Sequence, residues 1–411
     1  MYEHMFIPFD KTALTEGTIY EFSMDWKLLE YTSDKERQIS KLYFVGYNPS
    51  QGETVKDNSV PLAYLADLKG TGDWVNTVLR LRVSDLSAYE QFGIYLRYTT
   101  STPHTEADDT IYIDNLKLQV AEDQSVLTPI ELNEAERTED TIKVLAFGNS
   151  FSKDATEFIE ELATADGVDL RVGNAWIGGC ALLRHYNNMF NGTTDYTFDY
   201  HNPETTGGNQ TFTKVSMYQA LTATDWDYIT IQQVSGNSGK IDTFEPYLSE
   251  LVKYFKEVCP NAEIRLHMTW AYEHEYSGLS NYENSQTVMY ESIIDTYLQA
   301  SKNHGYVRLI PSGEAIQRLR ATDEFAEQSL NRDGFHLSDK GRLTAALVWY
   351  ETFTGISALD AKFDLTTAIG TVSDTKDVNV GVTAEEDHAM RTSAHEAASL
   401  YKKSQRSPES Y

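Results

Sequence analysis

The chain has 411 residues and a net charge of −28, because 62 Asp and Glu outnumber 34 Lys and Arg. At roughly 150 residues per domain this length predicts two or three domains, and 41% apolar residues are enough to give each a core. The charge excludes bare nucleic acid as a partner and disfavours anionic membrane surfaces, since both would repel the chain. No run of residues approaches the roughly 18 apolar positions that a membrane span needs.

Residues 1–122 are predicted to form a β-sandwich or jelly roll. Along residues 18–28, apolar and polar residues alternate as a half-buried strand requires. One face of that strand carries Tyr20, Phe22, Met24 and Trp26. Further strands are predicted at residues 41–47, 74–83, 92–98 and 110–120. Short strands separated by turn residues at this spacing are typical of antiparallel sandwiches.

Residues 123–140 are polar and acidic and contain Pro129, so they are predicted to be a linker. From Thr141 to the C-terminus, residues 141–411, strands alternate with helices. Apolar strand candidates lie at residues 142–147, 168–174, 226–232, 262–268 and 306–310. Five such strands with helices between them predict a parallel, doubly wound sheet.

The helices of this second domain carry recognisable start and stop residues. Asp154 is predicted to cap the first of them. Others are predicted at residues 246–258, at 285–301, and after His336, where Gly355 would end the helix. Thr383 and Glu386 form a capping box, which predicts a final helix over about 383–403.

The chain offers no pattern for a metal or cofactor. Cys180 and Cys259 are too few for a disulfide framework and have no C-x-x-C partner, although one bridge between them stays open. There is no H-E-x-x-H motif, and the histidines show no metal-ligand spacing. We therefore expect neither a metal nor a cofactor.

A candidate catalytic set spans the two ends of the second domain. Ser150 follows the first predicted strand, at the sheet edge where open α/β sheets bind ligands, and precedes a helix whose free N–H groups suit an oxyanion. A serine in an ordinary strand–helix turn is the alternative. Asp333 and His336 lie three residues apart on a predicted loop, so the carboxylate can orient the imidazole while its other nitrogen takes the serine proton.

The blocks Gly148-Asn149-Ser150 and Asp333-Gly334-Phe335-His336 together resemble the first and last motifs of the SGNH (GDSL-like) hydrolase family. The resemblance covers about residues 141–355, and Asn149, where the family usually has Asp, is similar to a branch found in polysaccharide-degrading bacteria. It implies a flavodoxin-like three-layer α/β/α domain with Ser150 as nucleophile, His336 as base and Asp333 as its orienting partner.

The same resemblance implies an oxyanion hole built from three donors. Besides the Ser150 N–H, these are the N–H of Gly178 or Gly179 and a side-chain amide. For that amide Gln233 is favoured over Asn237, because it lies nearer the predicted strand end.

Further candidate residues are named from their positions in the sequence. Ser238, in a second Gly-Asn-Ser tripeptide, is a formal rival nucleophile but lies in a glycine-rich loop with no helix directly behind it. Candidates for substrate contact are Asn149, His185, Trp270 and Tyr272. The two aromatic residues suit a wall on which sugar rings stack, and core packing is their alternative.

The first domain also resembles a known type, the galactose-binding-like jelly rolls of carbohydrate-binding modules. The similar segments are Gly17–Ser23, the turn Gly72-Asp73-Trp74 and the closing strand Ile111–Leu118. These segments describe the fold more than sugar binding, and such modules often serve as structural neighbours only.

The two resemblances together imply a serine esterase that removes acyl groups, foremost acetyl, from polysaccharides, with an acylated carbohydrate as its partner. The alternatives are a non-catalytic glycan-binding surface protein with an SGNH-like scaffold and an acyltransferase that uses the same three residues. Relatives with an added jelly roll are usually exported, whereas residues 1–10 have no basic, apolar signal pattern. The expectation is therefore an exported protein whose signal peptide is not part of this sequence.

Overall fold

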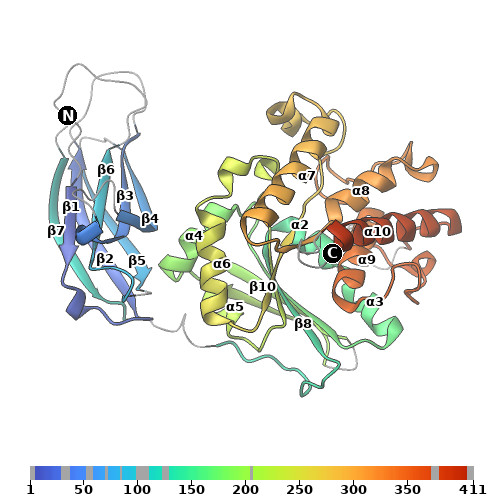
Figure 1. Ribbon diagram of the computed structural model, residues 1–411, viewed down its shortest axis with the longest axis horizontal. Coiled ribbons are helices and arrows are strands. Elements are labelled where there is room, and N and C mark those ends of the chain that lie inside the picture. Colours follow the sequence, from blue (N-terminus) through green and yellow to red (C-terminus); the bar gives the residue numbers. More distant parts are fainter. Residues whose placement is uncertain are drawn as a thin grey trace. The chain divides into compact units, whose positions relative to one another are not determined.

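The computed structural model describes residues 5–28, 38–51, 59–69, 73–83, 86–98, 111–122, 129–203, 207–371 and 379–404. The chain divides into two compact units, residues 1–128 with 186–193, and residues 129–185 with 194–411 (Figure 1). Within the described ranges, no helix is both long and apolar enough to cross a membrane.

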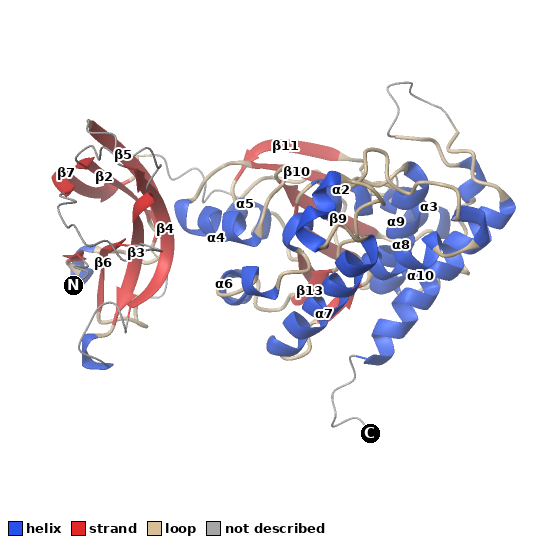
Figure 2. Ribbon diagram, turned by 90° about the horizontal axis from the view of Figure 1, so that it is seen from above, coloured by secondary structure: helices blue, strands red, loops and turns tan. Residues whose placement is uncertain are grey.

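The first unit contains two antiparallel sheets (Figure 2). One has the strand order β1 (Met5–Phe9), β6 (Gln91–Tyr98), β3 (Gln38–Tyr47) and β4 (Ser59–Lys69). The other has the order β5 (Trp74–Arg82), β2 (Ile19–Leu28) and β7 (Ile111–Val120). The rings of Phe9 and Phe22, one from each sheet, have centroids 6.3 Å apart, so the sheets share a core.

The predicted alternation in β2 is confirmed, because Tyr20, Phe22, Met24 and Trp26 are all buried. All five strands predicted in this unit are present, but β1 and β4 were not predicted. Each contains a proline, Pro8 or Pro61, which argues against a central strand. Both strands lie at the edge of their sheet, where the missing N–H of proline can be tolerated. Gly72 of the predicted Gly72–Trp74 turn lies outside the described residues.

The second unit is built on a seven-stranded sheet with the order β11-β10-β9-β8-β12-β13-β14. The predicted parallel strands are confirmed as β8 (Ile142–Gly148), β9 (Leu170–Trp176), β12 (Tyr228–Ile231), β13 (Glu263–His267) and β14 (Arg308–Ile310). A sheet of only five strands is wrong, because β10 (Tyr196–His201) and β11 (Gln210–Val215) extend it antiparallel beyond β9. The alternating burial of Tyr196, Phe198 and Tyr200 is a strand signal that the sequence analysis missed.

Helices cover both faces of this sheet (Figure 1). On one face, α9 (Asp339–Thr354) packs against α2 (Ser150–Thr156), α3 (Ile159–Asp166), α8 (Ser312–Arg320) and α10 (Ala384–Ser404). The other face carries α5 (Met217–Leu221), α6 (Tyr247–Val258) and α7 (Gln286–Asn303), and α4 (Leu182–Asn191) follows β9. Because these strands are parallel, the carboxyl ends of β8, β9, β12 and β13 lie at one edge of the sheet.

Helix α9 ends before Gly355, as predicted, and α6 begins at Tyr247, one residue after its predicted start at Pro246. The predicted capping box is present at α10, where the Thr383 hydroxyl accepts from the Glu386 N–H at 3.2 Å and the Glu386 carboxylate accepts from the Thr383 N–H at 2.9 Å. The prediction that Asp154 caps the first helix is wrong. Helix α2 begins at Ser150, and its cap is Asn149, whose Oδ1 accepts from the Phe151 N–H at 2.9 Å. Asp154 lies inside that helix.

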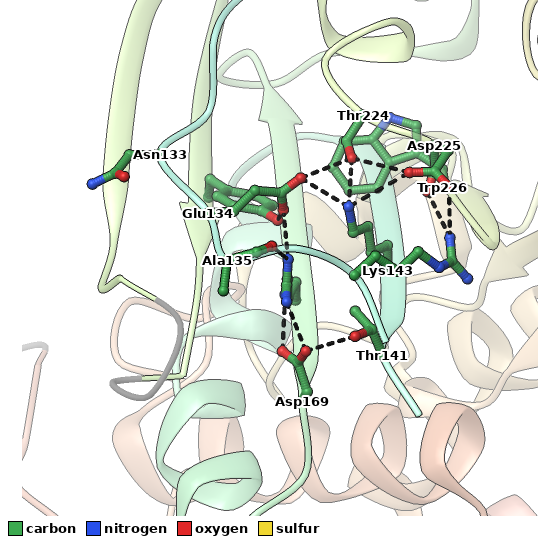
Figure 3. A network of polar contacts seen from close by, with 12 residues as sticks. Asn133, Glu134, Ala135, Thr141, Lys143, Asp169, Thr224, Asp225 and Trp226 are labelled. Carbon is green, nitrogen blue, oxygen red and sulfur yellow. Dashed lines mark hydrogen bonds and ion pairs between the residues drawn. The ribbon is translucent and has the colours of Figure 1, made fainter. Parts of the chain in front are cut away.

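Residues 129–140 form neither helix nor strand, yet they are attached to the second unit by Glu134 (Figure 3). Its carboxylate lies 2.8 Å from the Lys143 ammonium, 3.0 Å from Arg171 and 2.9 Å from the Thr224 hydroxyl, and it also accepts from Tyr200. Lys143 and Arg171 lie at the amino ends of β8 and β9. The later part of the predicted linker is thus part of this unit, and its residues 123–128 lie outside the described residues.

Candidate active site

Ser150, His336 and Asp333 form one hydrogen-bonded chain. Ser150 is the first residue of α2, directly after β8, and its Oγ lies 2.7 Å from His336 Nε2. His336 Nδ1 lies 2.7 Å from Asp333 Oδ2. Because the carboxylate can only accept, Nδ1 carries the proton and Nε2 is left to accept the serine proton.

Asp333 is held in place by its own loop. Its Oδ1 accepts from the N–H groups of His336 at 2.8 Å and Phe335 at 3.2 Å. Burial acts to raise the pKa of Asp333, but the hydrogen bonds from the His336 ring and from these N–H groups outweigh it, so the pKa lies below its ordinary value. The carboxylate is therefore ionised at neutral pH and can stabilise an imidazolium at His336.

The loop that carries His336 is held to helix α2 by Asp154, one turn beyond Ser150. Asp154 is 1% exposed and accepts from the Leu337 N–H at 2.9 Å. Its carboxylate also binds Arg332 Nη1 at 3.0 Å and Arg342 Nε at 2.8 Å. Asp154 thus fixes the distance between the helix that carries Ser150 and the loop that carries His336.

Phe151 and Phe335 lie next to the His336 ring, and Trp270 and Tyr272 are buried in the core. Trp270 is fully buried, stacks on Phe151 with centroids 4.2 Å apart, and donates its indole N–H to the Phe335 carbonyl at 2.8 Å. Tyr272 is buried as well, with its hydroxyl 2.8 Å from Ser235 Oγ. The structure therefore places both in the core behind the histidine loop instead of in an exposed sugar-stacking wall.

The glycine pair Gly178–Gly179 lies in a turn beside Ser150. In the turn Ile177–Cys180 the Cys180 N–H donates to the Ile177 carbonyl at 3.1 Å, and the Ile177 N–H donates to the Gly148 carbonyl at 3.2 Å. A Cβ added to Gly178 or Gly179 would meet no atom within 4 Å, so both face open space, and Gly179 has a φ of +62°. Neither glycine N–H donates to any of the described residues. The turn thus offers backbone donors next to Ser150.

The favoured side-chain donor, Gln233, is already occupied. Its Nε2 has two N–H donors and lies 3.0 Å from the Thr243 carbonyl and 3.1 Å from the Thr243 hydroxyl, and its Oε1 accepts from the N–H groups of Leu182 and Val234 at 3.0 and 2.8 Å. Gln233 therefore ties three loops together and has no donor left for an oxyanion. The side-chain amide of Asn237, in the short helix η5 (Ser235–Asn237), makes no hydrogen bond with any residue that the structure describes, so it is the remaining candidate.

Ser238 is not placed as a nucleophile. It is fully buried, accepts from the Thr269 hydroxyl at 2.8 Å and donates to the Val234 carbonyl at 3.2 Å. These partners include no histidine, so nothing in this arrangement would activate its hydroxyl.

Two further residues that were assigned to the pocket are buried in the fold. His185 Nδ1 lies 2.8 Å from the Tyr196 hydroxyl, and burial lowers the His185 pKa to about 3, so its ring is neutral at physiological pH. Asn149 is buried, and all of its side-chain hydrogen bonds are made within the protein. Neither side chain is free to contact a substrate.

Cys180 and Cys259 are free thiols, and burial raises the pKa of Cys180 to about 12, so this thiol is protonated at neutral pH. Across the described part of the chain, no group of three or more His, Cys, Asp or Glu side chains is placed to hold a metal ion. The sequence assigned Asp154 only to a helix cap and gave Gln232 and His267 no role at this site. The partners of all three lie far along the chain, and no local motif marks these contacts.

The fold and site define a class: an α/β domain with a Ser–His–Asp chain beyond the carboxyl ends of its parallel strands. Residues 143–387 match the family described as "Domain of unknown function (DUF4886)", and the chain belongs to this family. It is similar to the crystal structure of a DUF4886 family protein from Bacteroides uniformis ATCC 8492. The two share 35% sequence identity with a TM-score of 0.56, and the alignment covers 64% of this chain and 96% of that one.

More distant similarity links the chain to GDSL-like and esterase structures. The crystal structure of the acetyl xylan esterase AlAXEase aligns with 16% identity and a TM-score of 0.36, over 51% of this chain and 98% of that chain. A GDSL-like lipase from Bacteroides thetaiotaomicron VPI-5482 aligns with 11% identity and a TM-score of 0.34, over 54% and 92% of the two chains. No curated protein that was compared with the sequence matches it.

Proposed function

We propose that this protein is a serine esterase with Ser150 as its nucleophile. The observation that carries the proposal is the placement of His336 between Ser150 and Asp333, at 2.7 Å from each. In this proposal His336 takes the Ser150 proton as the oxygen attacks the ester carbonyl, and then gives it to the departing alcohol. Water, deprotonated by His336, releases the acyl group from Ser150 in the second half of the reaction.

The oxyanion of the tetrahedral intermediate is held in this proposal by backbone N–H groups. As the first residue of α2, Ser150 has an N–H with no acceptor inside the helix. The Gly178–Gly179 turn, whose two glycines face open space, supplies a second donor. The side-chain amide of Asn237, which makes no hydrogen bond with the described residues, is the candidate for a third.

The proposed substrate is an acetylated polysaccharide. This proposal comes from the resemblance of the two halves of the sequence to SGNH hydrolases and to carbohydrate-binding jelly rolls. A net charge of −28 agrees with a neutral, esterified glycan and disfavours a strongly anionic one.

Hydrolysis of p-nitrophenyl acetate tests the proposal most directly. We expect the intact protein to hydrolyse this ester and Ser150→Ala to lose at least about 10³-fold in kcat/KM. Ser238→Ala is the matched control, since it removes a hydroxyl from the other Gly-Asn-Ser tripeptide, and it should retain activity. If the intact protein hydrolyses no ester, the proposed function is wrong.

Release of acetate from acetylated polysaccharides tests the proposed substrate. Transfer of an acetyl group to an added sugar would favour the acyltransferase alternative.

A second candidate function, glycan binding by the first unit, is favoured by one surface. On the three-stranded sheet, Lys27 of β2 pairs with Trp74 on one side and Tyr112 on the other, and these two aromatic side chains are 53% and 47% exposed. Next to them Asp25 accepts from Asn76 and Asn115, at 2.6 Å each. Exposed aromatic faces beside polar groups suit a sugar chain. Retardation in gels containing xylan, lost in a Trp74→Ala/Tyr112→Ala double variant, would support this function.

A further inference from the structure

One buried amide joins the two segments that carry the backbone donors. Asn149 Oδ1 accepts from the Phe151 N–H at 2.9 Å, which caps α2 at Ser150. Asn149 Nδ2 donates to the Cys180 carbonyl at 3.0 Å, which holds the end of the Ile177–Cys180 turn. The side chain therefore bridges the nucleophile and the glycine turn, using its acceptor on one and its donor on the other.

A buried relay fixes which way this amide faces. Gln232 Nε2 donates to Asn149 Oδ1 at 2.9 Å, and Gln232 Oε1 lies 2.6 Å from His267 Nδ1. His267 Nε2 in turn lies 3.0 Å from Ser312 Oγ. Gln232, His267 and Ser312 come from the carboxyl ends of β12, β13 and β14.

The protonation of this relay follows from its geometry. Burial lowers the pKa of His267 to about 3, so the ring is neutral and carries one proton. Because Gln232 Oε1 can only accept, that proton is on Nδ1, and Nε2 accepts from the Ser312 hydroxyl. A rotation of the Asn149 amide by 180° would place its nitrogen against two donors and its oxygen against a carbonyl. The amide thus has one orientation.

We propose that Asn149 is a positioning residue for ester hydrolysis, setting the Gly178–Gly179 turn relative to Ser150 so that their N–H groups converge on the oxyanion. The inference rests on the proposed esterase function and deepens it. It requires both ends of the amide: the oxygen that caps α2 and the nitrogen that holds the Cys180 carbonyl. Gln232, which fixes the orientation, acts one step further from the reaction.

Two substitutions separate the cap from the bridge. Asn149→Ser and Asn149→Asp both keep an oxygen that can cap α2, but neither keeps the N–H₂ donor to Cys180. We expect kcat for p-nitrophenyl acetate to fall about 10- to 100-fold in both, with KM changed less than about 3-fold, because the displaced turn contacts the oxyanion and not the bound ester.

The pH dependence of Asn149→Asp gives a readout that a general loss of stability would not produce. A protonated carboxyl group can donate to the Cys180 carbonyl, whereas the carboxylate places a charged oxygen against it. The activity of Asn149→Asp relative to the wild-type protein should therefore rise as the pH is lowered, while the same ratio for Asn149→Ser stays flat. A flat ratio for both variants, or full activity in both, would overturn the proposal.

Thiol labelling tests the same idea without catalysis. Cys180 is buried at the end of the turn, and Cys259 lies in another part of the unit and serves as an internal reference. Iodoacetamide should label Cys180 at least about 5-fold faster in Asn149→Ser than in the wild-type protein, with Cys259 unchanged. Equal acceleration at both thiols, or at neither, contradicts a local role. If no ester is hydrolysed, the esterase proposal fails, and the labelling still decides whether Asn149 holds the turn.

Discussion

The two ends of the parallel strands in the second unit use opposite kinds of polar chemistry. At the amino ends, formal charges are paired and buried: Lys143 and Arg171 have side chains that are 3% and 1% exposed and are bound by Glu134 (Figure 3). At the carboxyl ends, the buried network that joins Asn149, Gln232 and an uncharged His267 is neutral, whereas the ionised Asp333, which binds His336, is exposed.

The difference shows what each network does. Removing one partner of a buried ion pair is strongly destabilising, because it leaves a buried charge without a partner. The amino-end network attaches residues 129–140 to the sheet. Neutral amides instead orient the backbone near Ser150 without adding a charge that would compete with the oxyanion of the proposed reaction. A buried charge lies one helical turn beyond Ser150, where Asp154 binds Arg332 and Arg342 and again acts as an attachment.

The largest expected effect is on activity, and it comes from the carboxyl ends of the strands. His336→Ala removes the proposed base, and we expect kcat/KM for p-nitrophenyl acetate to fall about 10⁴-fold, roughly 5.5 kcal/mol of transition-state stabilisation. Because the His336 side chain is partly exposed, its loss should change the free energy of unfolding by less than about 1 kcal/mol. A large loss in the free energy of unfolding would show that His336 also holds its loop in place, as the ion pairs at the amino ends hold residues 129–140.

The next effect is on stability. Asp154→Ala removes the common partner of Arg332 and Arg342 and the acceptor of the Leu337 N–H. We expect the free energy of unfolding in urea to fall by about 3–5 kcal/mol, as when one partner of a buried ion pair is lost. A loss below about 1 kcal/mol would mean that the charges near the histidine loop are well solvated.

Glu134→Gln tests the amino-end network and should cost about 2 kcal/mol at pH 7, because Lys143 and Arg171 keep other partners, Asp225 and Asp169. Burial acts to raise the pKa of Glu134, but its hydrogen bonds, from Lys143 first, outweigh burial and lower the pKa below 4.5. The stabilisation is therefore complete above pH 4.5 and is lost as the pH falls through the lowered value.

The stability gap between Glu134→Gln and the wild-type protein should accordingly be widest above about pH 5 and close at lower pH. Urea unfolding at a series of pH values measures it. A gap that does not change with pH would mean that the carboxylate charge contributes nothing to this attachment.

The smallest effect is expected at an exposed ion pair that also lies at the amino ends of the strands. Arg308 at the start of β14 lies 3.7 Å from Glu263 and has a side chain that is 62% exposed. Arg308→Ala should change the free energy of unfolding by less than about 0.5 kcal/mol, because surface ion pairs are screened by water and salt. A loss comparable with that of Glu134→Gln would remove burial as the explanation of the difference.

Much of the fold could be predicted because it depends on local patterns. The five parallel strands are short apolar runs, and the alternation in β2 reads directly as one buried face. The edge strands β1 and β4 contain prolines that conceal them. For α2, two residues able to cap a helix lie five positions apart, and only the backbone shows that Asn149 is the cap.

The site was predictable where chemistry needs particular residue types, and unpredictable where it depends on burial. Ser150, Asp333 and His336 were named from their residue types and positions, and the structure brings the three together. Gln233, Trp270 and Tyr272 have side chains suited to substrate contact, yet each is occupied inside the fold. The partners of Asp154 lie 178 and 188 residues further along the chain, and no sequence pattern predicts contacts over that distance.

The contact between Ser150 and His336 has a consequence for refolding. The two residues are 186 positions apart, and bringing such distant segments together carries an entropic cost before any contact is gained. Contacts of long sequence separation slow folding, whereas helices form from local contacts. On dilution from denaturant we expect the far-ultraviolet circular dichroism signal to recover first and ester hydrolysis to return only afterwards. The recovery of hydrolysis would then measure when the segments that carry Ser150 and His336 come together.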